Sequence, residues 1–385
     1  MSGTVGPTAQ AGGASSSASG RARLTRRGLL GGLAGLPVLS AAGLPSLALA
    51  AVAPAPAAAP APVPTLPAAA NLLVGGPRGG VTDRWAKALA SGLARGLPPG
   101  TGLRLTSVGG VDGVTAANQF DARTDPDGGT LLVVPGDAAL AWLAGDPRAQ
   151  FDAAHWVPVM AAAGSAVLVG RMGLDALFRR PTLRLACSSA TGPATAVLLA
   201  LDLLGLPVRP QFGLVDAAAK RGAYAAGDAD FVLLHGPDVP RQVAAYVALG
   251  AQPVFSLGAT DIDGAPVRDP LFPDLPTVVE LHARLRGAAP SGPLYQAWRA
   301  TVAATELTFG LMLPPLTPAS LVAVWRRVGD EAVMAPAMVA ETTAHALRPL
   351  PPTAAAAAIR LLAASPASLL ELRSWLATRW NYRPT

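Results

Sequence analysis

The sequence predicts an α/β protein in which strands, glycine-containing loops and helices alternate. Three short apolar runs, at 72–74, 103–108 and 130–134, each end in a loop that contains glycine. Helix-like spacing of apolar residues follows the first two loops, at 85–93 and 114–120. Binding sites of open α/β sheets lie at the carboxyl ends of the strands, so these loops are the expected site.

Composition and charge argue against a nucleic-acid-binding surface. The chain has 385 residues, enough for one large or two ordinary domains, and a formal net charge of +6. The first 50 residues contain no acid and four arginines, Arg21, Arg23, Arg26 and Arg27, and removing these four charges leaves only +2. A near-neutral body offers no electrostatic footprint for DNA or RNA.

Residues 1–50 have the pattern of an export signal. Arg26 and Arg27 precede an apolar run and the small-x-small site 48–50, which resembles a twin-arginine signal peptide. The run 28–53 exceeds about 20 residues and could instead remain as a membrane anchor, but its Gly and Pro content favours cleavage. Residues 51–70 alternate Ala and Pro and predict a stiff linker. We therefore expect a periplasmic protein, tethered to the membrane if the signal is retained.

The single cysteine, Cys187, cannot form an internal disulfide and has no metal-ligand pattern around it. It ends an apolar run at 183–187, so a buried structural thiol is expected.

The loop 75–83 brings a helix N-terminus to the end of the first strand. Thr82 or Asp83 can cap this helix, and its unpaired N–H groups and dipole favour an anion in the loop. Loops of the same kind occur at 109–113, 135–137 and 188–195. Each alone is also compatible with an ordinary turn. Together they predict a polar, carboxylate-seeking cleft that needs no cationic side chain.

Seven motifs follow one another in a fixed order between residues 71 and 345. They are Gly79–Asp83, Gly109–Gly113, Pro126–Leu132, Trp156–Val159, Ser188–Thr195, Gly227–Phe231 and Asp269–Thr277 with Glu280. In this order they resemble the Bug-type solute receptors of tripartite tricarboxylate transporters. The set is far more specific than any one of its members.

The resemblance implies a type II periplasmic-binding-protein fold, with two α/β lobes, a hinge and a ligand cleft between the lobes. Lobe 1 would comprise 71–167 and 253–385, and lobe 2 would comprise 168–252. Within lobe 2 the sequence independently predicts strands and helices, at 183–187, 194–204, 231–234 and 239–249, before a strand begins at 252. The helical tail past Arg348 is expected to pack on lobe 1.

Four departures from the family leave the ligand open. Gly129 stands where the family usually has Tyr, Leu105–Ser107 replaces an Asn-Arg-Pro lead-in, and Gly213–Val215 replaces a Tyr-x-Gly turn. Arg78 occupies a position that is usually small or Pro, where its guanidinium could pair with a ligand carboxylate or point to solvent. His235, at the end of a predicted strand, is a weaker candidate.

The resemblance and the loops together predict a receptor rather than an enzyme, with no catalytic residue, metal ligand or cofactor. Its partners would be a small organic acid and the permease subunits of a tripartite tricarboxylate-type transporter, and the receptor itself is expected to be a monomer. The predicted ligand-binding residues are Arg78, Gly79, Gly80, Val81, Thr82, Asp83, Gly110, Pro135, Gly136, Asp137, Ser188, Ser189, Thr191, Gly192, Thr195 and His235.

Two other functions remain open from the sequence. An exported hydrolase could use Ser188 or Ser189, although no Gly-x-Ser-x-Gly elbow is present and the four histidines are scattered. A ligand-sensing partner of a membrane signalling protein would have the same sequence features as a transport receptor. The segment 261–264 mimics the start of a calcium loop but lacks the later ligands, so a turn is expected there.

Overall fold

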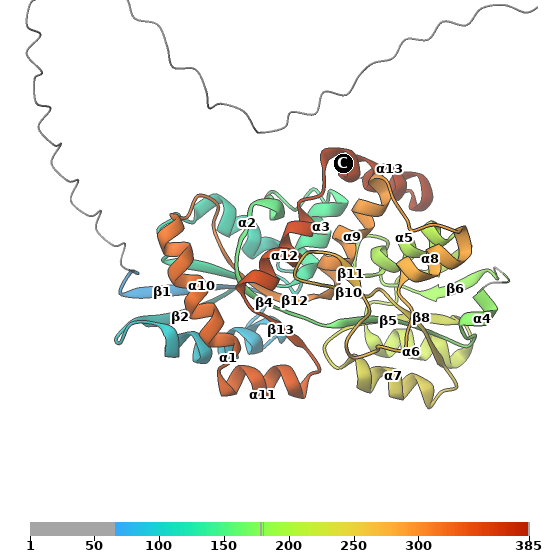
Figure 1. Ribbon diagram of the computed structural model, residues 1–385, viewed down its shortest axis with the longest axis horizontal. Helices are drawn as coiled ribbons and strands as arrows, with labels where there is room; N and C mark the ends of the chain where they lie inside the picture. The colour runs from blue at the N-terminus through green and yellow to red at the C-terminus, as the bar shows by residue number, and fades with distance from the viewer. Residues whose placement is uncertain (1–65, 178, 180, 384–385) are drawn as a thin grey trace, which may run out of the picture. The chain divides into compact units, whose positions relative to one another are not determined.

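The computed structural model describes residues 66–177, 179 and 181–383. All of them belong to the second of two compact units, Ala61–Thr385, which is described here by itself. The predicted export signal and nearly all of the predicted linker lie outside the described residues. Two sheets with helices on both faces organise this unit (Figure 1).

The first sheet has six strands in the order β13-β4-β12-β3-β1-β2. β1 pairs in parallel with β2 and β3, whereas β12 runs antiparallel to β3 and β4. The strands are β1 (Ala69–Gly75), β2 (Gly102–Val108), β3 (Thr130–Val134), β4 (Val157–Ala163), β12 (Leu307–Leu313) and β13 (Arg348–Leu350).

Alternate residues of β1 face opposite layers of helices, because successive side chains of a strand point to opposite faces. Leu72 and Val74 share a core with α1, α10 and α11, whereas Leu73 shares one with α2, α3 and α9. The elements around this sheet are α1 (Val81–Gly96), α2 (Val114–Arg123), α3 (Gly136–Ala144), the 3₁₀ turn η1 (Ala153–His155), α9 (Pro293–Glu306), α10 (Ala319–Val333), α11 (Pro336–Ala344), α12 (Pro352–Leu362) and α13 (Pro366–Trp380).

The second sheet has five strands in the order β7-β6-β8-β5-β9. Its strands are β5 (Ser165–Gly170), β6 (Leu183–Ala186), β7 (Val208–Gln211), β8 (Phe231–Gly236) and β9 (Gln252–Ser256). α6 and α7 pack on one face, and α5 and α8 pack on the other. The remaining elements are α4 (Leu174–Leu177), α5 (Ala194–Leu204), α6 (Ala217–Ala226), α7 (Val239–Val247), α8 (Val278–Arg286), β10 (Ala259–Thr260) and β11 (Pro266–Val267).

The two-lobed α/β class predicted from the sequence is confirmed, and β3 and α5 have the predicted bounds. The chain passes from the first sheet to the second at Gly164, between β4 and β5. Strands of the second sheet run from Ser165 to Ser256, and α8 packs against α5 of that sheet. The lobe limits of 168 and 252 stay a prediction.

The last helix, α13, packs on α3 and α9, which belong to the predicted lobe 1, and it also contacts α5 of the second sheet. Arg373 donates hydrogen bonds to the carbonyl oxygens of Trp142 and Leu143 on α3. The Trp375 indole N–H donates to the carboxylate of Asp202 on α5, at 3.1 Å. Figure 1 shows α13 in dark red above α9 and α5.

Among the described residues no single helix has the length and apolarity to cross a membrane. Only α12 and α13 taken together, with a bend of 61° between them, reach that length and apolarity.

A buried carboxyl lies beside the passage between the sheets. The backbone N–H of Gly164 donates to the carbonyl oxygen of Glu306 at 2.8 Å. The Glu306 side chain is 5% exposed, and its Oε2 lies 3.5 Å from Nη2 of Arg348. Burial outweighs the attraction of Arg348 and raises the pKa of Glu306 to about 8.

We predict that Glu306 makes the protein less stable as pH rises from its usual pKa of 4.5 through about 8. In this window the unfolded chain loses the proton first, so the unfolding free energy falls. Glu306→Gln should reduce the loss of stability between pH 5 and pH 8 by on the order of 2 kcal/mol, measured by urea unfolding. Identical pH slopes for the two proteins would contradict this.

We also predict that Gly136→Ala destabilises the fold by about 1–3 kcal/mol or displaces α3. A Cβ at this position would lie 1.9 Å from the carbonyl oxygen of Ala304 and 2.7 Å from that of Leu307. Gly222→Ala is the matched control, because a Cβ there meets nothing within 4 Å. In the middle of α6 it should stabilise by about 0.5–1 kcal/mol. Denaturant unfolding of both variants checks this, and equal effects would refute it.

Candidate functional site

A cavity of about 270 Å³ lies where loops of the two sheets meet. From the first sheet it is lined by the loops that follow β1, β2 and β3 and by the junction of α9 with β12. From the second sheet it is lined by the end of β8 and the loop that follows. The lining residues are Pro77, Val81, Thr82, Val111, Pro135, Gly136, Asp137, His235, Gly236, Pro237, Ala304, Thr305, Leu307 and Thr308.

The N-terminal turn of α1 forms one wall of the cavity through Val81 and Thr82. Its N-cap residue, Gly80, has extended backbone angles and supplies no side-chain hydrogen bond. The first N–H groups of α1 therefore have no side-chain cap, and they carry the positive end of the helix dipole. This is a suitable position for an anionic group.

Asp83 holds the loop before α1 in place. Its Oδ2 accepts the backbone N–H of Gly79 at 2.8 Å, and its Oδ1 accepts the hydroxyl of Ser107, at the end of β2, at 3.0 Å. Lys87 Nζ lies 2.8 Å from Oδ2. The hydrogen bonds from Lys87, Gly79 and Ser107 hold the pKa of Asp83 below its usual value against the effect of burial. The side chain is occupied by these contacts and does not line the cavity.

The loop before α3 is pressed against the α9–β12 junction. The backbone oxygens of Ala304 and Leu307 lie so close to Gly136 that only glycine fits there. Pro135 and Asp137, on either side of Gly136, line the cavity together with Thr305 and Thr308 of the junction. The Thr305 hydroxyl donates to the carbonyl oxygen of Thr301, whereas the buried Thr308 Oγ1 has no partner among the described residues.

Asp137 places a carboxyl group in the wall of the cavity. It is half-buried in the first turn of α3, and it has no hydrogen bond or ion pair with any residue that the structure describes. Burial raises the pKa of Asp137 to about 6, with a further upward effect from Asp112 and a downward one from Lys220.

The second sheet contributes His235 and a neighbouring lysine. His235 is the penultimate residue of β8 and lines both this cavity and an adjoining one of about 230 Å³. Lys220 of α6 lines the adjoining cavity. Burial, with the charge of Lys220, lowers the pKa of His235 to about 4, so its ring is neutral near pH 7. Burial likewise lowers the pKa of Lys220.

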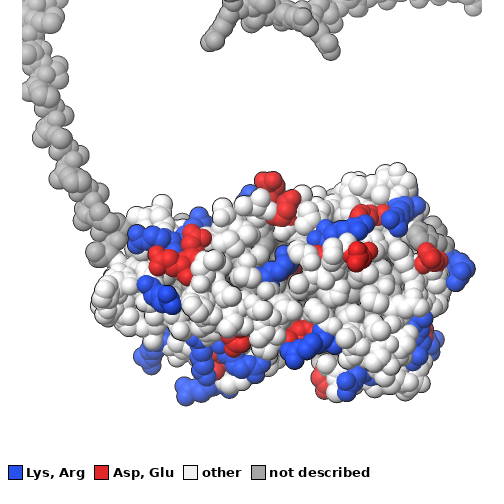
Figure 2. All heavy atoms as spheres, turned by 60° about the horizontal axis from the view of Figure 1, so that its bottom comes forward, with Lys and Arg blue, Asp and Glu red and all other residues white. Residues whose placement is uncertain are grey.

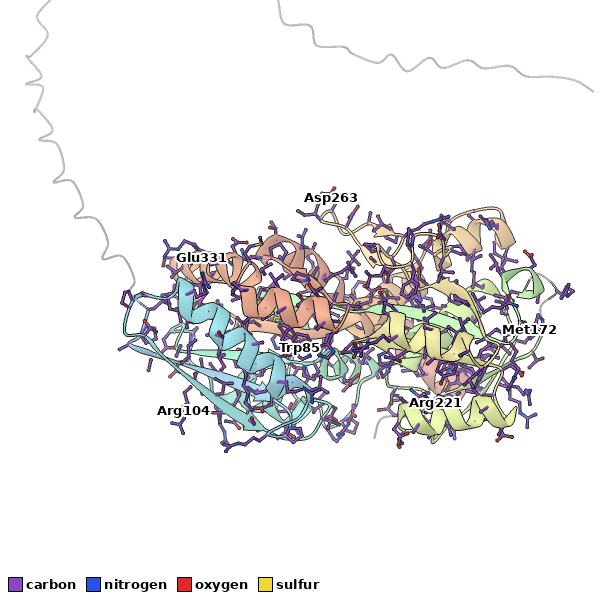
Figure 3. The ribbon with its side chains drawn as sticks, turned by 90° about the horizontal axis from the view of Figure 1, so that it is seen from below. Trp85, Arg104, Met172, Arg221, Asp263 and Glu331 are labelled. Atoms are coloured by element: carbon purple, nitrogen blue, oxygen red, sulfur yellow. The ribbon has the colours of Figure 1, made fainter. Side chains whose placement is uncertain are left out.

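A contact between elements of the two sheets closes one side of this region. The backbone N–H of Asp238, before α7, donates to the carbonyl oxygen of His345, after α11, at 2.8 Å. Nδ1 of His345 lies 3.0 Å from Oδ2 of Asp238. The His345 ring packs edge-on against Trp85 of α1, with 5.6 Å between centroids (Trp85 is labelled in Figure 3). Pro237, next to Asp238, is thereby held against the cavity.

Six of the predicted ligand-binding residues line the cavity: Val81, Thr82, Pro135, Gly136, Asp137 and His235. Arg78, Gly79 and Gly80 belong to the same loop as Val81 but do not line it, and Arg78 is exposed. Asp83 lies beneath the loop, and Gly110 lies beside the lining residue Val111.

The predicted loop at 188–195 also lies outside the cavity lining, with Ser188, Ser189, Thr191, Gly192 and Thr195. The Thr195 hydroxyl donates to the carbonyl oxygens of Ala190 and Gly192, so the loop closes on itself before α5. Neither serine is hydrogen-bonded to a histidine or carboxylate within the described part of the chain.

Sequence reasoning missed the α9–β12 junction and Lys220. The junction carries none of the seven motifs and no glycine or proline that would mark a loop. Lys220 is one of only two lysines in the chain, the other being Lys87. This rarity is the one sequence feature that could have marked Lys220 as a candidate site residue.

Metal-ligating groups, surface charge and the single cysteine do not contribute to this site in the described part of the chain. No group of three or more His, Cys, Asp or Glu suited to a metal ion occurs within the described residues. Basic and acidic side chains are interspersed on the face shown in Figure 2. Cys187 is buried, and burial raises the pKa of its thiol to about 12, which agrees with the structural role expected from the sequence.

No protein-family model matches the chain, and no curated protein matches its sequence. Among solved structures, a TctC solute binding protein from Polaromonas without ligand is 16% identical and has a TM-score of 0.58, with 80% of this chain and 98% of that chain covered. The periplasmic binding protein BugD is 16% identical over 80% of this chain and 97% of its own, with a TM-score of 0.48. MatC from Rhodopseudomonas palustris with bound malate is 19% identical over 81% and 99%, with a TM-score of 0.48.

The Polaromonas protein establishes the fold of this chain at the level of its two lobes. This neighbour is of the TctC solute-binding type that the seven motifs resemble, so the predicted resemblance is confirmed as a likeness of fold.

We predict that Asp83→Ala costs about 1–3 kcal/mol of stability, because the Gly79 N–H and the Ser107 hydroxyl lose their acceptor. Lys87→Ala is the matched variant on the other side of the ion pair. It should cost less than about 0.5 kcal/mol, since the lysine side chain is 61% exposed. Urea unfolding at neutral pH compares the two variants. Equal losses would show that the ion pair, not the hydrogen bonds to the loop, carries the role of Asp83.

Proposed function

We propose that this chain is an exported receptor that captures a small carboxylate-bearing organic solute between its lobes. It delivers the solute to a permease of the tripartite tricarboxylate type. The observation that carries the proposal is the cavity of about 270 Å³, walled by the uncapped N-terminus of α1 on one side and by the β8–α7 loop on the other.

The lining of the cavity is suited to a small organic anion. Helix N–H groups stabilise negative charge without a cationic side chain, and the hydroxyls of Thr82 and Thr308 can add hydrogen bonds. Most of the other lining residues, such as Val81, Val111 and Leu307, are apolar and can enclose a hydrocarbon skeleton. A few fixed polar groups in an apolar wall are typical of small-molecule sites.

Lobe closure is the expected mechanism of capture. The lining comes from both sheets, so a bound solute contacts both and stabilises the form in which they are close. The hydrogen bonds between Asp238 and His345 support this closed form beside the cavity. The fold shared with the Polaromonas solute binding protein supports the same mechanism.

Several further properties belong to this proposal. The receptor is periplasmic, is exported by the twin-arginine route and acts as a monomer without a cofactor. The sequence pattern of an export signal at 1–50 supports the location, and the permease is the expected partner from the family resemblance. A hydrolase has no support from the site, since Ser188 and Ser189 lie apart from the cavity lining.

The test is a thermal shift against mono-, di- and tricarboxylates and aromatic acids, followed by calorimetry on those that stabilise. A solute at 100 times its Kd should stabilise the fold by about 2.7 kcal/mol, since it binds the folded state alone. Thr82→Val should weaken binding by about three- to tenfold through the lost hydroxyl. Thr353→Val, at an exposed position of α12, is the matched control and should bind as the parent does. No shift with any acid would refute the proposal.

A further inference from the structure

Asp137 places a negative charge in the wall of a cavity whose other features favour a carboxylate ligand. It lines the wall and is unpaired among the described residues. With a pKa of about 6 it is largely ionised at neutral pH. The positive end of α3 stabilises this charge in part. The carboxylate nevertheless has no hydrogen-bond or ion-pair partner among the described residues, and it would repel a ligand anion placed beside it. The structure gives it no counter-ion of its own in contact.

The other charged groups around Asp137 do not relieve this charge. Asp112 is itself an acid and cannot neutralise Asp137. The cation near it, Arg148, is paired with Asp112, with 2.9 Å between Nη1 and Oδ2. His235 is neutral near pH 7. Lys220, on α6 of the second sheet, acts on Asp137 only through space and forms no ion pair with it in the described structure.

The two helix N-termini in the first-sheet wall therefore differ in chemistry. α1 has a glycine N-cap and no acid in contact with the cavity, because Asp83 is turned to Gly79 and Ser107. α3 carries Asp137 in its first turn, so a carboxylate already occupies the positive end of that helix. Within this wall the α1 N-terminus is suited to an anion and the α3 N-terminus to a cation.

We infer that the solute carries an ammonium group as well as a carboxylate, with Asp137 as the partner of the ammonium and the α1 N-terminus as the site of the carboxylate. This inference rests on the proposed function and narrows its ligand class to amino-bearing acids. The ammonium would give Asp137 the charge-assisted hydrogen bond that it otherwise lacks. Asp137 is then a specificity-determining residue, because an acid without the amino group leaves it unpaired.

The experiment compares acids that differ only in the amino group: aspartate with succinate, glutamate with glutarate, and alanine with propionate. Calorimetry at pH 7.5 should give at least one pair in which the amino-bearing acid binds about 10- to 100-fold more tightly. Asp137→Asn should abolish that preference, through weaker binding of the amino-bearing acid and tighter binding of the acid without the amino group, which the carboxylate no longer repels.

Asp263→Asn is the matched control, since the same charge is removed at an exposed turn between β10 and β11. Asp263 is labelled at the outer margin of Figure 3, well away from Trp85. This variant should retain the parent's preference. A measurement on the unaltered chain guards against a variant that fails to fold. Between pH 7.5 and pH 5 Asp137 becomes protonated, so the affinity for the amino-bearing acid should fall. This fall should be larger than that for the matched acid without the amino group.

The outcomes separate this inference from the proposed function. If acids without the amino group bind as tightly as their partners, or if Asp137→Asn weakens both equally, the inference is wrong and the receptor proposal stands. If no acid of either kind binds, the proposed function fails and the inference fails with it.

Discussion

The architecture depends on a close backbone contact at the α9–β12 junction. The carbonyl oxygens of Ala304 and Leu307 lie against Gly136 of the first sheet's β3–α3 loop. The carbonyl oxygen of Glu306, between them, accepts the N–H of Gly164, where the chain passes to the second sheet. A Cβ on Gly164 would lie 2.4 Å from the backbone oxygen of Gly236, at the end of β8. The junction thus contacts both the start of α3 and the passage between the sheets, and that passage packs against the end of β8, the central strand of the second sheet.

Two acids near this contact, Glu306 and Asp137, are destabilised in their ionised forms. Glu306 and Asp137 are both poorly solvated because they are buried in this region. Glu306 lies within the junction and Asp137 is next to Gly136, which contacts it, and burial raises the pKa of both acids. Only Glu306 has a cation in reach, Arg348. The same packing that positions the site therefore leaves Asp137 in need of a partner.

The sequence predicted the fold well because strands, turns and helices are encoded locally. Glycines after apolar runs located the loops that contain Val81, Thr82 and Asp137, and the strand end at His235. The junction at 304–308 was not predictable, since it passes from helix to strand without a turn residue and acquires its role from long-range packing. Nor could local pattern show that Asp83 faces inward to Gly79 and Ser107 while Asp137, in a similar loop, faces the cavity.

Arg78 and Asp137 show how charge acts in such a site. From the sequence Arg78 could pair with a ligand carboxylate or point to solvent, and in the structure its side chain is exposed and outside the lining. Helix N-termini already favour an anion, so a cationic side chain would add attraction without discrimination. An acid in the wall does discriminate, because it penalises every ligand that cannot neutralise it. The backbone dipoles of this cavity favour any small anion. Asp137 opposes that preference, so it is the residue that most narrows the class of ligand.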